Sequence, residues 1–219
     1  VAQVSVVHEF ANILDNLDNE WEIPSTILYD KLPKDTHHGW KYIAFGPDDK
    51  LYIPVGAPCN TCTRDLPYAS IQALDLTSKE LTNVAKGVRN TVGFSRHPDT
   101  KELWFTDNGR DSLGDTIPPD ELNKLSQVGE DFGFPACGGT QTLDAGADCS
   151  TKTVPQVTLG AHVASLGMKF YTGDQFPTHY KNQVFIAEHG SRNSSVPVGY
   201  RVMTVKKKKK SYEVFIDWW

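Results

Sequence analysis

The sequence lacks long hydrophobic runs and lacks an excess of positive charge. No apolar stretch approaches the ~18 residues that a membrane-spanning helix needs. The 219 residues hold 22 Lys and Arg against 27 Asp and Glu, a net charge of −5. Nucleic-acid binding depends on basic side chains that contact phosphates, so an acidic chain is poorly suited to it. We therefore expect neither a transmembrane segment nor a nucleic-acid partner.

Cysteine is also scarce, and the four cysteines allow three interpretations. Cys59 and Cys62 are separated by two residues in a loop rich in Pro, Gly and Asn, whereas Cys137 and Cys149 flank a longer loop. A four-cysteine zinc site needs two close pairs, which the second spacing fits poorly. A thioredoxin-type redox pair opens a helix, which Pro58 opposes. We expect two local disulfides, Cys59–Cys62 and Cys137–Cys149.

The predicted compartment follows from these cysteines, because disulfides persist in oxidising environments. The chain starts at Val1 with neither an initiator Met nor the basic segment of a signal peptide, so we expect a processed or partial product. Asn193 opens an Asn-Ser-Ser sequon and is a predicted glycosylation site in a eukaryotic source. The predicted location is extracellular or periplasmic.

What the chain does contain is a series of short strands separated by turns. Residues 40–45 and 51–55 are strand-like and enclose a Gly-Pro-Asp-Asp turn, in which Pro pre-sets φ. The order of strand, turn and aromatic strand recurs within residues 91–106 and 166–187. Further strand pairs are predicted at residues 70–76 with 81–85 and at 200–205 with 211–216. Four strands in ~40–50 residues are typical of a β-propeller blade.

The pattern therefore predicts an all-β fold with little helix. Residues 118–125 are the one segment expected to be helical, since their two prolines suit a first turn. Three complete units are recognisable, and propellers close with ~4–8 blades. We expect an incomplete chain, because an open array of blades exposes apolar edges.

Five consecutive lysines, residues 206–210, stand between two strand candidates. One interpretation is a patch for an anionic partner. The other is a solvated hairpin turn that also blocks edge pairing, and we favour it.

Three polar clusters lie at an end of the first strand of each unit. They contain His38, then Arg89 with Asn90, then His162. The innermost strands of a propeller line its channel, so the clusters are expected to converge there. Histidine suits a general base near neutral pH, and Arg with Asn suits an anionic or carbonyl-bearing ligand. The alternative is that these polar side chains only form hydrogen bonds with one another in the channel and bind no ligand.

The loop at residues 106–115 is dense in oxygen ligands. Calcium binds carboxylates and backbone carbonyls, although the spacing here is not that of an EF-hand. An Asx-rich turn is the competing interpretation.

Several motifs carry a resemblance to a known family. The most specific is Glu-Leu-Trp-Phe-Thr-Asp-Asn-Gly-Arg-Asp at residues 102–111, and another is Asp-Thr-His-His-Gly-Trp-Lys at 35–41. Further matching motifs lie at residues 45–48, 54–60, 87–94, 114–115, 118–123, 132–135 and 187–191. These motifs resemble the quinoprotein sugar dehydrogenases of the sorbosone dehydrogenase type, which are similar to soluble glucose dehydrogenase. The resemblance extends over nearly the whole chain.

The resemblance implies one six-bladed β-propeller domain over residues 1–219, with about four blades covered and both ends incomplete. It implies pyrroloquinoline quinone and Ca²⁺ on the channel axis. By motif, His38 is the implied catalytic base, Arg89 and Asn90 contact the cofactor, and the carbonyls of Gly109 and Arg110 bind calcium. The implied reaction is oxidation of an aldose or related sugar by hydride transfer to the quinone, with an external electron acceptor.

Two positions depart from the family's motifs. Arg192-Asn193-Ser194 stands where the family usually has Trp-Asn-Arg, and we expect Arg192 to replace the missing cation. Gly138 stands where the family often has His. The altered residue Ser194 favours an alternative function, a non-catalytic β-propeller that binds a glycan or a protein.

Overall fold

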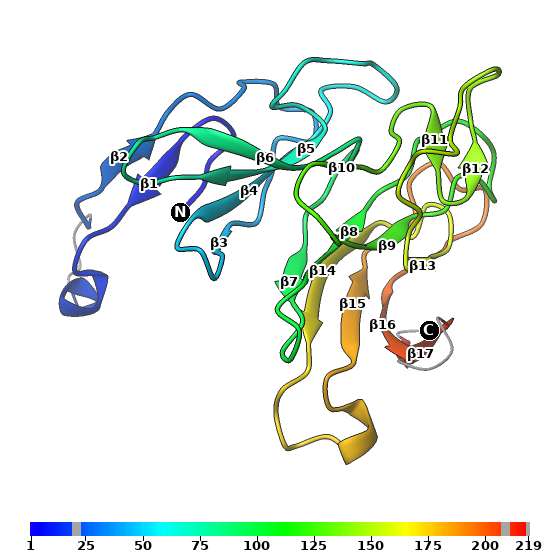
Figure 1. Ribbon diagram of the computed structural model, residues 1–219. Helices are drawn as coiled ribbons and strands as arrows, with labels where there is room; N and C mark the ends of the chain where they lie inside the picture. The colour runs from blue at the N-terminus through cyan, green and yellow to red at the C-terminus, as the bar shows by residue number, and fades with distance from the viewer. Residues whose placement is uncertain (19–22, 207–210, 218–219) are drawn as a thin grey trace.

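The computed structural model describes residues 1–18, 23–206 and 211–217, and it is built from β-sheets (Figure 1). The helices of the described residues are two short 3₁₀ turns, η1 (Ile13–Asn16) and η2 (Thr178–Tyr180). No helix in this part of the chain is long and apolar enough to cross a membrane. The all-β prediction is confirmed.

The first large sheet is an antiparallel meander with one added strand. In chain order its strands are β3 (Ala44–Phe45), β4 (Leu51–Val55), β5 (Ser70–Leu74) and β6 (Leu81–Lys86), and β10 (Glu130–Asp131) pairs parallel to β6. Every residue of β4 and β5 is buried. Such near-continuous burial is typical of strands covered on both faces of their sheet.

Two more four-stranded antiparallel meanders follow. The second sheet contains β7 (Phe94–Arg96), β8 (Leu103–Asp107), β9 (Glu121–Lys124) and β13 (Val157–Thr158). The third contains β14 (Ser165–Phe170), β15 (Val184–Glu188), β16 (Arg201–Lys206) and β17 (Ser211–Asp217). Two short pairs complete the fold: β1 (Val7–Glu9) with β2 (Thr26–Tyr29), and β11 (Cys137–Gly138) with β12 (Gln141–Thr142).

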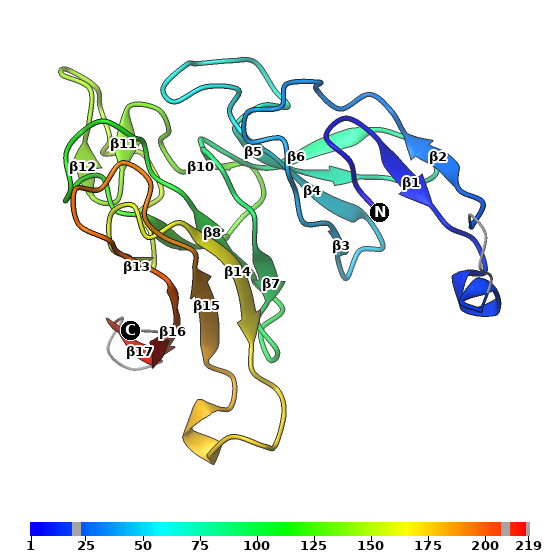
Figure 2. The same cartoon turned by 180° about the vertical axis from the view of Figure 1, so that it is seen from behind.

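The cores lie between consecutive sheets. One face of the first sheet packs through Ile53 and Leu74 against Val7 of the β1–β2 pair. Its other face packs through Ile71 against Phe105 of the second sheet, and Leu122 of the second sheet belongs to the core that includes Ile186 of the third. The sheets follow one another in chain order and, in the described residues, do not close into a ring (Figures 1 and 2).

The predicted helix at residues 118–125 is wrong, because residues 121–124 form β9, between β8 and β13. Leu122 faces Thr106 across one ladder and Val157 across the other. An isolated eight-residue helix is marginal in water, so two ladders and complete burial of Leu122 outweigh it.

Three other sequence predictions have different outcomes. Of the strand expected at residues 40–45, only Ala44–Phe45 is paired. Lysines 207–210 lie outside the described residues, so the interpretation of the lysine run stays a prediction. Both disulfides are present as predicted, Cys59–Cys62 and Cys137–Cys149, and exclude the four-cysteine zinc site.

Candidate functional site

Residues preceding or ending strands of all three sheets border one cavity of about 510 Å³. Its lining includes five of the six residues predicted as catalytic base, cofactor contacts or calcium ligands: His38, Arg89, Asn90, Gly109 and Arg192. His162 of the third polar cluster also lines it. The expected convergence of the three clusters is therefore present.

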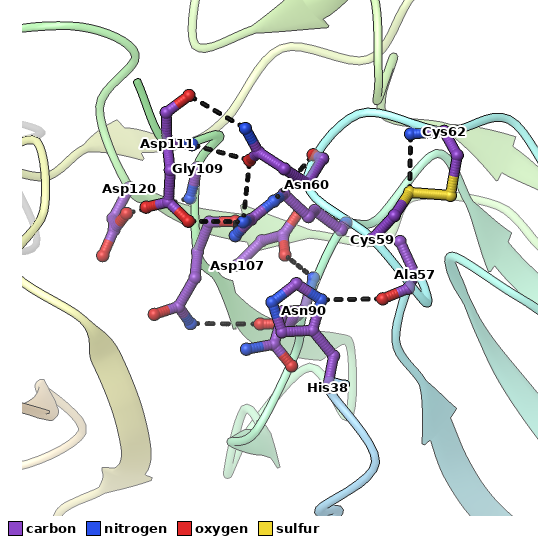
Figure 3. Close-up of polar contacts among 12 residues, drawn as sticks. His38, Ala57, Cys59, Asn60, Cys62, Asn90, Asp107, Gly109, Asp111 and Asp120 are labelled. Atoms are coloured by element: carbon purple, nitrogen blue, oxygen red, sulfur yellow. Dashed lines mark hydrogen bonds and ion pairs between the residues drawn. A yellow bond between two sulfur atoms is a disulfide. The ribbon is translucent and has the colours of Figure 1, made fainter. Parts of the chain in front are cut away.

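His38 sits in a left-handed backbone conformation with φ of 53°. Its ring nitrogen Nδ1 lies 2.8 Å from the Ala57 carbonyl oxygen (Figure 3). A carbonyl only accepts hydrogen bonds, so Nδ1 carries the proton and Nε2 keeps its lone pair. Burial, followed by the charge of Arg89 and that of His37, lowers the pKa of His38 to about 4. The imidazole is therefore neutral at neutral pH.

Gly56 makes room for His38. A Cβ at this position would lie 2.5 Å from the His38 Cβ and 2.7 Å from the His38 carbonyl oxygen. It would also lie 3.4 Å from Oδ1 of Asn90. The absence of a side chain at Gly56 lets two predicted site residues approach the same backbone.

Arg89 is buried, with 4% of its surface exposed, and its guanidinium is held on several sides. Nη1 donates to the Asn108 carbonyl at 3.2 Å, and Nη2 forms an ion pair with Asp111 at 3.0 Å. Nε and Nη2 also donate to Asn60. Four of its hydrogen bonds therefore go to neighbouring protein groups, so Arg89 organises the cavity wall in addition to bordering it.

Two buried carboxylates shape the backbone of the site. Asp107 accepts the backbone N–H of Arg89 at 2.8 Å and that of Asn90 at 2.6 Å. Asp120 accepts the backbone N–H of Gly109 at 2.9 Å and that of Ser165 at 3.0 Å. Burial raises the pKa of Asp107 to about 8, with a contribution from the charge of Glu121, and burial raises that of Asp120 to about 6.

The sequence did not indicate that either acid holds the backbone of the site, although Asp107 lies in the oxygen-rich loop at residues 106–115. Each hydrogen-bonds backbone groups at least 11 positions away, so no local spacing reveals the role. For Asp107 the available signal is its position directly after a predicted strand, where β8 ends, whereas Asp120 offered no such signal because residues 118–125 were predicted to be helical.

The predicted calcium ligands are the carbonyls of Gly109 and Arg110. Among the described residues, neither carbonyl accepts a hydrogen bond. Gly109 borders the large cavity, whereas Arg110 borders a small adjoining hollow of about 20 Å³. The Arg110 side chain donates to the Pro135 carbonyl at 2.9 Å and pairs with Asp144 at 2.6 Å.

The third sheet contributes His162 and Arg192. His162 is buried with φ of 60°, and its Nε2 lies 2.7 Å from the Gly114 carbonyl, to which it donates. Arg192 is exposed at the cavity. Asn193 is exposed as well, and its glycosylation stays a prediction. The Ser194 hydroxyl donates to the Val196 carbonyl at 2.6 Å.

Comparisons with known proteins begin with sequence. A family model described as TrAA12-like matches residues 138–214. A protein of Borreliella burgdorferi, described as an uncharacterized protein, is 38% identical over 215 residues. That alignment covers 94% of this chain and 57% of the relative.

Solved structures share the fold. The calcium structure of a Trichoderma reesei Carbohydrate-Active Enzymes Family AA12 protein has a TM-score of 0.76 at 18% identity, with 94% of this chain and 62% of that chain covered. The holo PQQ domain of pyranose dehydrogenase from Coprinopsis cinerea has a TM-score of 0.74 at 17% identity, covering 99% and 64%. The PQQ-bound aldose sugar dehydrogenase of Streptomyces coelicolor has a TM-score of 0.64 at 20% identity, covering 88% and 53%.

These likenesses show the fold alone, because the identities with the solved structures are only 17% to 20%. The chain spans 57% of its curated relative and 53% to 64% of these three structures. The activity of the whole protein is therefore a matter for proposal.

Proposed function

We propose that the chain is part of a quinoprotein oxidoreductase, a six-bladed β-propeller that oxidises an aldose or related sugar with pyrroloquinoline quinone and Ca²⁺. The proposed type is the sorbosone dehydrogenase type. The observation that supports the proposal best is the convergence of His38, Arg89, Asn90, Gly109 and Arg192 on one cavity. They come from four separate segments of the sequence, and they were selected from the sequence before the structure was considered.

The donor groups of the cavity suit an anionic quinone. The guanidinium groups of Arg89 and Arg192 border the cavity together with the amide of Asn90. Charge-assisted hydrogen bonds from such groups favour anions. The cavity volume of about 510 Å³ lies within the ~300–1,000 Å³ of small-molecule pockets. Hard cations prefer oxygen ligands, so the carbonyls of Gly109 and Arg110, which accept no hydrogen bond from the described residues, fit calcium. The residues present therefore fit both groups.

When bound, the quinone supplies a hydride acceptor and calcium supplies a Lewis acid. Nε2 of His38 accepts the proton of the sugar hydroxyl, because Nδ1 is protonated and donates to the Ala57 carbonyl. Arg89 and Asn90 hold the anionic ligand, and Arg192 adds a cation at the cavity. The sugar and an external electron acceptor are the proposed partners. The two disulfides favour an extracellular or periplasmic location.

A binding module for a glycan or a protein is the second candidate. Ser194 replaces an expected cation, and its hydroxyl bonds locally to Val196. Most guanidinium donors of Arg89 are used within the protein. The first observation means one positive charge fewer than expected, and the second leaves few guanidinium donors for a quinone.

The deciding experiment is dye reduction by the full-length protein reconstituted with the quinone and Ca²⁺, over a panel of aldoses. Turnover with at least one sugar supports the enzyme. Bound quinone without turnover on any sugar favours the binding module. Failure to bind quinone contradicts the proposed cofactor and points to the altered residues at Arg192 and Ser194.

A further inference from the structure

Asn60 occupies the centre of the disulfide loop that connects β4 to β5. It lies between Cys59 and Cys62, whose sulfurs are bonded at a sequence separation of 3. The Cys62 backbone N–H also donates to Sγ of Cys59 at 2.6 Å. The disulfide therefore closes the loop around Asn60, whose side chain points toward Asp111 (Figure 3).

The side chain of Asn60 pairs with the backbone of Asp111, 51 positions along the chain. Its Nδ2 donates to the Asp111 carbonyl at 3.0 Å, and its Oδ1 accepts the Asp111 backbone N–H at 2.8 Å. An amide that both donates to and accepts from one residue reproduces the pairing of two peptide groups. It joins the loop of the first sheet to the loop that connects β8 with β9.

Asn60 also holds Arg89. Nη2 of Arg89 donates to Oδ1 of Asn60 at 3.0 Å, and Nε donates to the Asn60 carbonyl at 3.2 Å. Nη2 is in turn paired with the Asp111 carboxylate at 3.0 Å. Asn60, Arg89 and Asp111 therefore contact one another in a closed set, and two of the three line the cavity.

We propose that Asn60, which does not line the cavity itself, is a positioning residue that fixes the Arg89 guanidinium and the Asp111 backbone at the cavity wall. The role of this wall in quinone binding rests on the proposed function. The fixation itself does not, because it concerns contacts within the protein. A ligand that meets a preorganised guanidinium does not have to order it on binding, so affinity depends on Asn60.

The experiment compares Asn60→Ala and Asn60→Asp with Asn83→Ala. Asn83 accepts a hydrogen bond from Gln72 at 3.3 Å in the same first sheet and does not line the cavity, so it controls for loss of an asparagine. Amide hydrogen exchange at Asp111 is measured without quinone or calcium. The quinone dissociation constant is measured by absorbance titration in Ca²⁺.

In Asn60→Ala we expect the Asp111 amide to exchange ~10–100-fold faster and the quinone dissociation constant to rise ~10–100-fold, as for the loss of hydrogen bonds to buried and charged partners. Asn60→Asp keeps an oxygen acceptor for the Asp111 N–H, so protection at this amide is expected to recover, although the quinone affinity stays below that of the wild type. Asn83→Ala is expected to change neither quantity.

Unchanged exchange at Asp111 in Asn60→Ala overturns the proposal, as does an equal loss of affinity in Asn83→Ala. If Asn60→Ala does not fold, an Asp111 amide left unprotected in a folded Asn60→Asp overturns it. A wild-type protein that binds no quinone contradicts the proposed function. In that case the exchange measurement still decides whether Asn60 positions Asp111.

Discussion

Two histidines of the cavity, His38 and His162, adopt left-handed backbone conformations, with φ of 53° and 60°. Such conformations cost about 1–3 kcal/mol each and persist only where the surroundings hold them. The His38 ring donates an N–H to the Ala57 carbonyl, and the His162 ring donates one to the Gly114 carbonyl. Each ring is therefore fixed in orientation and in tautomer.

Replacing His38 tests the proposed proton acceptor. In His38→Ala we expect the rate of dye reduction to fall ~10²–10⁴-fold, the usual contribution of general base catalysis. The quinone dissociation constant is expected to change much less, because His38 acts on the sugar proton. His179→Ala is the control, since His179 is exposed in η2 and does not line the cavity. Equal activity in the two variants would exclude His38 as the base.

The pH dependence of the rate follows from the lowered pKa of His38. The active form is the neutral imidazole, and the pKa is about 4 rather than the ordinary value of 6.5. We expect kcat/KM to be independent of this group above about pH 5 and to fall as the pH drops through about 4. The profile is measured with dye reduction, and a step near pH 6.5 that disappears in His38→Ala would contradict the lowered pKa of His38.

Gly56 offers a test of close packing at the site. Gly56→Ala places a Cβ 2.5 Å from the His38 Cβ, so the loop must shift, at a cost of about 1–3 kcal/mol in the free energy of unfolding. Gly167→Ala is the matched control, because a Cβ there meets no atom within 4 Å. Urea unfolding measures both variants, and dye reduction shows whether His38 is displaced. Equal stability of the two variants would show that the site tolerates a methyl group.

At the scale of elements, each disulfide closes one loop next to the site. The Cys59–Cys62 loop carries Asn60, and the Cys137–Cys149 loop includes Asp144, which pairs with Arg110. The Cys59–Cys62 loop is an irregular, half-buried connection between β4 and β5, whereas the Cys137–Cys149 loop contains the β11–β12 pair and the buried Cys137. The second loop therefore has ladder hydrogen bonds and a buried cysteine of its own, whereas the first depends on covalent closure and on the contacts of Asn60.

The two disulfides are expected to differ in their effects. In the chain-entropy account, closing the loop of separation 12 stabilises by about 3 kcal/mol and closing that of separation 3 by about 2 kcal/mol. Replacing Cys137 and Cys149 by Ser should therefore lower Tm more than replacing Cys59 and Cys62. Replacing Cys59 and Cys62 should instead lower quinone affinity more, because Asn60 loses its anchor. Calorimetry and quinone titration measure the two orders, and a reversal of either contradicts that assignment.

At the scale of the whole molecule, the cavity exists only because three sheets pack in succession. A ligand that binds across them therefore stabilises the packed state. At a concentration ~100 times its dissociation constant, the gain is about 2.7 kcal/mol. We expect quinone with Ca²⁺ to raise Tm by several degrees, and a calcium chelator to abolish the rise.

Arg192→Ala provides a comparison for this shift. Arg192 is exposed, so its loss should leave the Tm of the ligand-free protein unchanged. The shift caused by quinone and Ca²⁺ should become smaller, because one cation at the cavity is lost. An undiminished shift in Arg192→Ala would show that Arg192 does not replace the cation missing at Ser194.

The sequence by itself determined most strands and both disulfides. Short strand-like runs between turns predicted β4 (Leu51–Val55) with its observed bounds and β5, β8, β15 and β16 to within two residues at each end. The disulfides were predictable because each joins cysteines that are neighbours along the chain. Motifs also identified His38 and Arg89 as cavity residues.

Only the tertiary structure decided the rest. Residues 121–124 became a strand because β8 and β13 offered ladder partners on both sides, which no local propensity encodes. Asp107, Asp120 and Asn60 acquired their roles from groups as far as 51 positions away. Pairings over such distances depend on how the sheets pack, because the chain must first bring the two groups together before either bond can form.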